Sequence, residues 1–453
     1  MQVDQEELNR RIRYVCQLFK NTEWYAENRK RLESLNIDID NIRTPQDLFK
    51  AYEKGLYTTS GDLPKLITPY SVFRQWFLTS ATSARREGKL PRGKPIGMTL
   101  DDMARNKRAC KIGYEKFIEE GDRILDCFSH SPGIAGEASL HGLADFKVNV
   151  LHTGVQTLGN VDEFMRWYSI FRPNTVFGLP ASLYQLPLHL KKKNIEPSEL
   201  GIRKFMTGGQ PCSLKERKTI GSDFGDAVVY DWYASTESLG PMACEIEPFS
   251  DKYEVVIPEI LLSVVKKSEV LSEGERGNIL ITNLYQPGEI PHMVLVNYLF
   301  ADDEATCKEV AKEGCTTMIG NIENAVINLG GGKLSLREIK EIRAELEEDL
   351  YKGILSRNPP LTHNYRDENT RKDVGIIRLE TTIPLKDSEK IKLANLIRRK
   401  IYERNYPVWE QVEKVGSSEL YIEIVDPNEL FKGYEEYLTP GKPLELIKGR
   451  KNA

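Results

Sequence analysis

The hydrophobic pattern of the chain changes from helical spacing at its start to short buried runs further on. In residues 1–55, Tyr14, Phe19 and Trp24 recur among charged residues at roughly helical spacing, and Thr44 precedes PQDLFKAYEKG as a helix N-cap. Beyond this region, β-branched and aromatic runs such as ILDCFS, TVFG and VVYDWY alternate with amphipathic stretches. This alternation predicts a helical opening followed by an α/β fold that binds ligands at strand ends.

The length and composition are typical of a globular protein with more than one domain. The 453 residues exceed what one average hydrophobic core holds, so we expect two domains. No apolar run approaches the length of a membrane span, and the first twenty residues, MQVDQEELNRRIRYVCQLFK, follow an amphipathic helix pattern rather than that of a secretory signal. We therefore expect a cytoplasmic protein without a membrane partner.

Charge and cysteine usage exclude further classes. The chain has 63 basic and 67 acidic residues and a net charge of -4, which argues against nucleic acid as a partner. Its seven cysteines are odd in number and scattered without a CxxC pair, so we expect no disulfide framework. Cys244, Cys307 and Cys315 are expected to be buried thiols, with a shared metal ion as the alternative.

The stretch from 228 to 245, VVYDWYASTESLGPMACE, passes from a predicted buried strand into a polar turn. Asp231 can accept hydrogen bonds from an exocyclic amine, and the ring of Tyr233 can stack on a base. Thr236 can donate to a phosphate, and Glu237 can hold a magnesium ion through hard oxygen. These groups together suit a nucleotide. The alternative is an ordinary buried strand followed by an exposed acidic turn.

The segment DWYASTESLGPMACE resembles a motif of the adenylate-forming superfamily, which includes the acyl-CoA synthetases, and in particular of its phenylacetate-CoA ligase branch. In that branch an Asp-x-Tyr-Gly-x-Ser/Thr-Glu core precedes Gly-Pro and Cys-Glu, as GPMACE does at 240–245. The resemblance implies catalytic roles for Thr236 and Glu237, with magnesium bound to Glu237. It also implies nucleotide contacts along the rest of the motif: Asp231, Trp232, Tyr233, Ala234 and Ser235.

In the segment 72–99 an aromatic and apolar run leads into residues 79–84, TSATSA, which are rich in hydroxyls and are followed by a basic stretch with glycines. Hydroxyls can converge on phosphate oxygens while Lys or Arg balances the charge. By position the segment resembles the superfamily's phosphate loop, which implies ATP contacts from Thr79, Ser80, Thr82 and Ser83. Ala81 and Ala84 replace two glycines of that loop, so either its shape or its handling of ATP is altered, because alanine restricts positive φ and close backbone approach. A plain polar surface loop is the alternative.

The segment 201–214, GIRKFMTGGQPCSL, predicts a strand, a Gly-Gly turn and a helix. Gly208 and Gly209 let a flat ring lie against the backbone, and Gln210 and Pro211 are expected to begin the helix. The segment resembles the superfamily's Gly-Gly-Glu-Pro adenine platform, with Gln210 in place of Glu, which implies that these four residues contact the nucleotide. Because VVYDWY is the next predicted strand, the two motifs fall on consecutive strand ends.

Two further strand ends are similar in place to the superfamily's acyl pocket. His130 follows ILDCFS, and Phe177 and Gly178 end the run TVFG. The resemblance implies that these residues line the substrate pocket, and the aromatic side chains favour an aryl acid or a similar small carboxylic acid over an alkyl acid. The alternatives are a structural histidine at 130 and core aromatics at the strand end.

The later motifs depart further from the superfamily pattern. Asp302 falls where a carboxylate holds both ribose hydroxyls, although Asn297 replaces an arginine. The hinge motif Gly-Arg-x-Asp-Asp is GNIEN at 320–324. In PGKPLELIKGRKN, Lys442 is the candidate to bridge the substrate carboxylate and the α-phosphate, with Lys448 as the alternative.

The resemblance covers essentially the whole chain. It implies a large N-terminal α/β domain with several subdomains, residues 1–319, and a small mobile C-terminal α/β lid, residues 320–453. It implies activation of a carboxylic acid by ATP and Mg²⁺, then transfer to CoA, to another thiol such as a carrier protein, or to an amine. The alternative is a degenerate homologue that binds its ligand without turnover. A homodimer is common in this branch.

Overall fold

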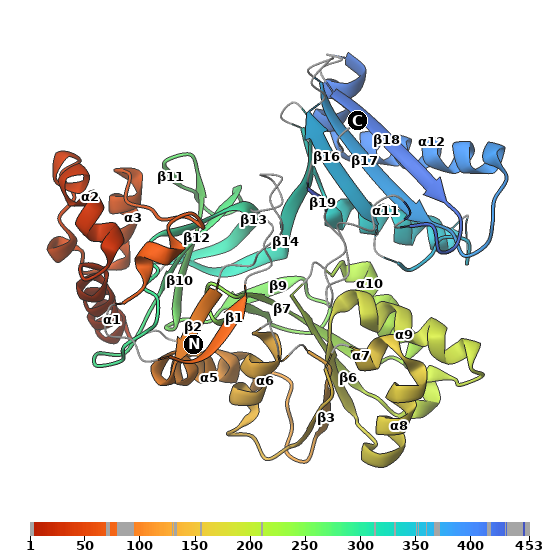
Figure 1. The fold of residues 1–453 in the computed structure, drawn as a ribbon, viewed down its shortest axis with the longest axis horizontal. Helices are drawn as coiled ribbons and strands as arrows, with labels where there is room; N and C mark the ends of the chain where they lie inside the picture. The colour runs from red at the N-terminus through yellow and green to blue at the C-terminus, as the bar shows by residue number, and fades with distance from the viewer. Residues whose placement is uncertain are drawn as a thin grey trace.

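A long mixed sheet organises most of the chain, and a smaller sheet lies above it towards the C-terminus (Figure 1). We describe the fold from a computed structural model. It describes residues 4–68, 73–78, 95–128, 130, 134–154, 156–209, 212–311, 314–329, 332–349, 351, 353–358, 360–366, 372–414, 418–430, 432 and 447–448.

The chain opens with three α-helices, as its helical spacing predicts: α1 (Gln5–Phe19), α2 (Glu23–Ser34) and α3 (Pro45–Glu53). Thr44 caps α3 and forms a capping box with Asp47, which confirms the predicted N-cap. Two 3-10 helices follow α2 and α3, η1 (Ile39–Asn41) and η2 (Leu63–Leu66). The three α-helices lie together at one end of the molecule (Figure 1).

One half of the large sheet is parallel. Its strands are β3 (Arg123–Asp126), β4 (Asn149–His152), β5 (Thr175–Gly178), β6 (Lys204–Gly208) and β7 (Val228–Ser235), in the order β7-β6-β5-β3-β4. The carboxyl ends of these strands therefore meet at one edge. The helices of this half are α5 (Leu100–Tyr114), α6 (Ala135–Leu143), α7 (Gln156–Gly159), α8 (Val161–Phe171), α9 (Pro180–Lys192), η3 (Pro197–Leu200) and α10 (Leu214–Asp223).

The other half of the large sheet is antiparallel and continues from β7 in the order β8-β9-β14-β13-β12-β10-β11, with β15 paired to β14. Its strands are β8 (Gly240–Glu245), β9 (Lys252–Val255), β10 (Ile260–Lys266), β11 (Glu269–Val270), β12 (Arg276–Asn283), β13 (Tyr298–Ala311), β14 (Gly314–Leu329) and β15 (Gly332–Ser335). A separate pair, β1 (Phe73–Leu78) and β2 (Pro95–Thr99), flanks the predicted phosphate loop.

The C-terminal part has its own sheet, in the order β18-β17-β16-β19. Its elements are α11 (Leu336–Asp349), β16 (Leu361–Arg366), β17 (Asp373–Glu380), α12 (Asp387–Arg404), α13 (Tyr406–Trp409), η4 (Glu410–Lys414), β18 (Ser418–Val425) and β19 (Ile447–Lys448). The predicted hinge at 320–324 is not a break between elements, because β14 runs through it. The proposed division between residues 319 and 320 falls inside this strand.

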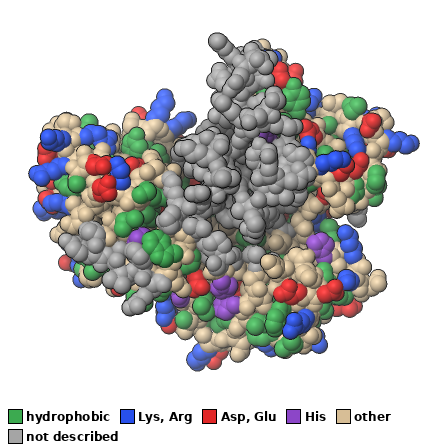
Figure 2. Space-filling view, in the orientation of Figure 1, with side chains coloured by type: hydrophobic (Ala, Val, Ile, Leu, Met, Phe, Trp, Pro, Cys, Tyr) green, Lys and Arg blue, Asp and Glu red, His purple; other side chains and the backbone are tan. Residues whose placement is uncertain are grey.

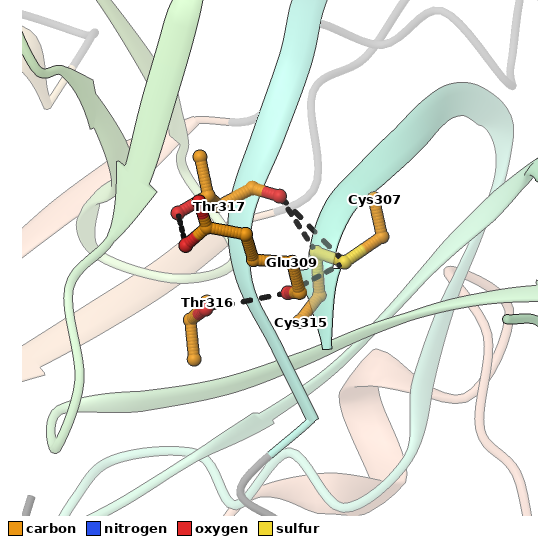
Figure 3. The surroundings of a disulfide bond; sticks show 5 residues. All are labelled: Cys307, Glu309, Cys315, Thr316 and Thr317. Carbon is orange, nitrogen blue, oxygen red and sulfur yellow. Dashed lines mark hydrogen bonds between the residues drawn. A yellow bond between two sulfur atoms is a disulfide. The ribbon is translucent and has the colours of Figure 1, made fainter. Parts of the chain in front are cut away.

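The expectation that Cys307 and Cys315 are free thiols is wrong. Cys307 on β13 and Cys315 on β14 form a disulfide, with Cα atoms 5.7 Å apart (Figure 3). The hairpin that joins the two strands brings these residues together, which their spacing in the sequence does not reveal. Because their sulfurs bond each other, the alternative of a metal ion shared with Cys244 is also wrong. The other five cysteines are free and buried.

Candidate active site

The predicted Gly-Gly turn lies at the carboxyl end of β6. Gly208 pairs with Trp232 of β7, and a Cβ added to it would lie 3.2 Å from the Trp232 carbonyl oxygen. Gly209 has a φ of 77° and is exposed, so it leaves the strand in a conformation that suits glycine. The helix does not begin at Gln210 as expected, because Ser213 caps α10 and the helix starts at Leu214. Gln210 and Pro211 lie outside the described residues.

The Thr-Glu turn lies at the end of the neighbouring strand β7. Residues 236–239 join β7 to β8, and the side chains of Thr236 and Glu237 are half-buried there. The hydroxyl oxygen of Ser235 accepts a hydrogen bond from the Ser238 amide at 3.0 Å, which closes the turn. The predicted strand-to-turn transition is thus confirmed, and the two motifs occupy adjacent strand ends.

Arg105 of α5 stabilises this turn by hydrogen bonds, a role that the sequence did not indicate. Its guanidinium is fully buried and donates to the Ser238 carbonyl at 2.7 Å and to the Glu259 carbonyl at 2.9 Å. Gly240, the first residue of β8, also lies against α5, since an added Cβ would come 2.0 Å from the Asn106 amide oxygen. Helix α5 therefore holds the turn in place through side chains that carry no recognisable motif.

Tyr233 of β7 links the edge that carries the two turns to β13. Its hydroxyl donates to the Asp303 carboxylate at 2.6 Å. Burial, together with the nearby Asp303 charge, raises the pKa of Tyr233 well above its usual value, so the phenol keeps its proton. The neighbouring Asp302 lies on β13, where only its backbone is described. Asp303, which no sequence motif marks, contacts the predicted site residue Tyr233 directly, whereas Asp302 was the residue expected at the site.

The structure contradicts the role expected for Asp231. Its side chain is 1% exposed, and it accepts hydrogen bonds from Thr207 Oγ1 at 2.6 Å and from the Tyr253 hydroxyl at 2.9 Å. It therefore does not present its carboxylate to an exocyclic amine. The reason is its position in the middle of β7, where side chains alternate between the two faces of the sheet. Ala234 and Ser235, further along the strand, remain half-buried at the edge.

A second set of buried charges lies beside Asp231. Arg217 of α10 and Glu245 of β8 have no exposed side-chain area and form an ion pair of 2.5 Å. Arg217 also reaches Asp251 at 2.7 Å, and the Glu245 carboxylate accepts from the Asp231 amide at 3.1 Å. These ion pairs and hydrogen bonds connect α10, β7 and β8, the elements that follow or carry the two turns.

The aromatic side chains expected near the site belong to the core. Trp232 packs against Tyr114 of α5, with ring centroids 4.6 Å apart, and is 7% exposed. Phe177 has no exposed area and stacks on the same Tyr114 at 5.8 Å. A Cβ on Gly178 would come 2.4 Å from Leu158, so this glycine admits α7 against the strand. The core alternative therefore describes the packing of Trp232, Phe177 and Gly178 among the described residues.

His130 is half-buried, 28% exposed, at the edge formed by the ends of β3 and β4. Its ring lies 4.8 Å from that of His152, and its Nε2 is 3.8 Å from the Asp126 carboxylate. Of Asp126, His130 and His152, only His130 is a residue that the sequence placed at a ligand site. The other predicted residues, namely Thr79, Ser80, Thr82, Ser83 and Lys442, lie outside the described residues.

Buried charges also join α11 to α10. Arg343 of α11 and Glu216 of α10 form an almost fully buried pair at 2.8 Å. Arg357 reaches Asp223 at 2.8 Å and lies over the ring of Tyr184. A cavity of about 620 Å³ opens at the same junction, lined by residues of α10, α11 and α12, and none of the predicted site residues lines it.

None of the described helices is both long enough and apolar enough to span a bilayer.

No protein-family model and no curated protein sequence matches this chain. Its fold is nevertheless similar to that of solved CoA ligases. 2-Hydroxyisobutyryl-CoA ligase in the postadenylation state, in complex with 2-HIB-AMP, has a TM-score of 0.69 at 16% identity, over 98% of this chain and 89% of the ligase. The anthranilate CoA ligase AuaEII, in complex with anthranoyl-AMP, has a TM-score of 0.54 at 14% identity, over 78% and 63%.

The o-succinylbenzoate CoA synthetase from Bacillus subtilis, in complex with OSB-AMP, has a TM-score of 0.51 at 14% identity, over 81% of this chain and 69% of the synthetase. The chain therefore has the fold of the adenylate-forming ligases, and the predicted fold class is confirmed. At these identities the likeness establishes the fold, and the chemistry must be argued from the site.

Proposed function

We propose that the chain uses ATP and Mg²⁺ to convert a small carboxylic acid, aryl or similar, into an acyl-adenylate with release of pyrophosphate, as an AMP-forming ligase of the phenylacetate-CoA ligase-like branch. The observation that carries the proposal is the juxtaposition of two turns. The Gly208–Gly209 turn and the Thr236–Glu237 turn end adjacent parallel strands, at the edge where α/β sheets bind nucleotides.

The residues present at this edge fit an adenine nucleotide. Gly209 is exposed and Gly208 has no side chain, so a base can approach the backbone there. Tyr233 lies at the same edge as a half-buried side chain hydrogen-bonded to Asp303, and its ring would stack on the base. Asp302 is retained as the proposed ligand of the ribose hydroxyls, and Gln210 and Pro211 as further contacts.

The residues also fit magnesium and phosphates. Glu237 offers a half-buried carboxylate on a turn, which is the hard oxygen ligand that Mg²⁺ prefers. When bound, the ion neutralises charge on the phosphates as pyrophosphate leaves. The Thr236 hydroxyl would donate to a phosphate oxygen, and the proposed phosphate loop and Lys442 would complete the site. Catalysis would rest mainly on positioning and charge neutralisation.

We propose CoA as the acceptor of the acyl group, because ligases of this fold have been solved with CoA bound. Another thiol, such as that of a carrier protein, or an amine remains the alternative. The same proposal includes a cytoplasmic location, a mobile C-terminal domain from residue 320 onward, and a homodimer.

A degenerate homologue that binds its ligand without turnover is the second candidate. Ala81 and Ala84 favour it, because they stand where the resemblance has the glycines of the phosphate loop.

Pyrophosphate release tests the proposal. We expect release from ATP and Mg²⁺ that depends on an aryl or alkyl carboxylate from a panel, with hydroxylamine as a generic acceptor. Glu237→Gln should slow it by about 10²–10³, as loss of one charge-stabilising group does elsewhere. Glu273→Gln, at an exposed turn between β11 and β12, is the matched control and should leave the rate unchanged. Lys442→Ala and Lys448→Ala would separate the two candidate lysines.

Absence of release across the panel, with no shift of the melting temperature by ATP, would reject adenylation and leave a fold without the activity. A shift of the melting temperature by ATP without release would select the degenerate homologue.

A further inference from the structure

Three side chains with metal-binding atoms converge at the ends of β3 and β4. Asp126 is the last residue of β3, His152 is the last residue of β4, and His130 follows β3 in the chain. One ligand atom from each lies within 4.8 Å of the other two. We propose that Asp126, His130 and His152 form a site for a divalent cation of the zinc class, separate from the magnesium site proposed at Glu237.

The distances suit a small transition-metal ion. The Asp126 Oδ2 lies 2.9 Å from His152 Nδ1 and 3.8 Å from His130 Nε2. Tetrahedral zinc with bonds of 2.0–2.1 Å places its ligand atoms roughly 3.3 Å apart. The two observed separations bracket this value, so small side-chain rotations bring all three atoms into range. Ligation through Nδ1 of His152 requires the tautomer with its proton on Nε2.

The surroundings hold the ligands in the orientation that a metal requires. The Phe128 amide donates to Asp126 Oδ1 at 2.9 Å, and Oδ2 forms a hydrogen bond with His152 Nδ1 at 2.9 Å, which an ion bound between the two atoms would replace. Glu137 of α6 lies 3.8 Å from Nδ1 of His130, the nitrogen opposite the one aimed at Asp126. A small side-chain rotation would bring this carboxylate into hydrogen-bond reach of Nδ1, where it would fix the tautomer of a ligating histidine. Gly136 packs directly against the ring, since an added Cβ would lie 2.7 Å from it.

One polar atom in this cluster lacks the partner that burial demands. Within the part of the chain that the structure describes, His130 Nε2 is buried without a hydrogen bond, although it points to the Asp126 carboxylate. A bound cation would satisfy it and would also neutralise the fully buried Asp126.

Ligand chemistry selects the kind of ion. Imidazole suits Zn²⁺, Cu²⁺, Fe²⁺ and Ni²⁺, whereas Mg²⁺ prefers oxygen ligands. Two histidines and one carboxylate leave a position open for water or another ligand, as in catalytic zinc sites. The His130 and His152 side chains are 28% and 24% exposed, so both rings contact solvent although the ligand atom Nε2 of His130 is buried. Figure 2 shows histidine side chains at the surface over the region where Figure 1 places α6.

Zinc binding by the full-length, tag-free chain tests the proposal. The protein is stripped with a chelator and dialysed against zinc sulfate in the presence of excess Mg²⁺, and its zinc content and affinity are then measured. We expect about one zinc per chain, with binding weakened more than about 100-fold in His130→Gln and in His152→Gln, and about tenfold in Glu137→Gln. His189→Gln on α9 is the matched control and should bind as the parent does.

Circular dichroism and melting temperature in chelator establish that each variant is folded. Replacing the bound ion with Co²⁺ should give visible absorption bands in the parent that both ligand variants lose. No retained zinc in the parent would overturn the proposal. So would zinc that both ligand variants retain fully, or a loss in His189→Gln equal to theirs. None of these readouts depends on adenylation activity.

Discussion

Two places on the same edge of the large sheet use their polar residues in opposite ways. At the ends of β6 and β7, the Asp231 side chain is buried and accepts hydrogen bonds from two protein hydroxyls. The groups that remain for a ligand at this edge are backbone atoms and the Thr236–Glu237 turn. At the ends of β3 and β4, Asp126 faces two partly exposed histidines.

The position of each carboxylate within its strand explains the difference. Asp126 is the last residue of β3, whereas four residues follow Asp231 before β7 ends at Ser235. A carboxylate inside a sheet must be satisfied by its neighbours, since burying it unpaired is costly. A carboxylate at the strand end can serve a ligand. The first edge is thus held rigidly by the protein, and we propose that it binds a nucleotide, whereas the second is a cluster of side chains for which we propose a metal ion.

The strongest test of the rigid support is Arg217→Met. Removing the guanidinium leaves Glu245 buried without its cation, which should lower the free energy of unfolding by about 3–5 kcal/mol. Urea unfolding measures this loss. Arg203→Met, which changes an exposed arginine just before β6, is the control and should stay near the parent. Equal stability of the two variants would show that the buried charges do not support this edge.

Tyr233→Phe should have the next largest effect. It removes the hydrogen bond to the Asp303 carboxylate but keeps a ring for stacking, so we expect a loss of about 1.5–3 kcal/mol in the free energy of unfolding. The KM for ATP should rise, because the ring is no longer held to β13. If the KM and the stability both stay at parental values, the link between β7 and β13 does not position the nucleotide.

Asp231→Asn distinguishes a structural aspartate from a nucleotide contact. We expect a loss of about 1–3 kcal/mol in stability, because Thr207 and Tyr253 donate to this carboxylate. The affinity for ATP, measured by calorimetry under conditions where both proteins are folded, should remain within a few-fold of the parent. A large loss of ATP affinity at unchanged stability would restore the originally expected contact with the exocyclic amine.

Gly209→Ala should have the smallest effect on stability. At a φ of 77°, alanine costs about 1–2 kcal/mol, which unfolding measurements can resolve. If this backbone contacts the adenine, the KM for ATP should rise as well, because the added methyl group occupies the open face. Gly201→Ala, at a φ of 67° before β6, has similar strain and should leave the KM unchanged.

The sequence by itself determined the helical opening, several strands of the parallel half and the two motifs on consecutive strand ends. It also determined local features such as the Thr44 cap and the polar turn after β7. These features depend on residues close together in the chain, and hydrophobic periodicity and turn chemistry record them directly.

Only the tertiary structure decided which distant residues meet. The inward direction of Asp231, the contact of Tyr233 with Asp303, the disulfide between Cys307 and Cys315, and the meeting of His130 with His152 all depend on strand register and on the order of strands in the sheet. Likewise, β14 continues through the expected hinge because its neighbours pair with it. Pairing across a sheet is a non-local property, so local sequence patterns do not determine it.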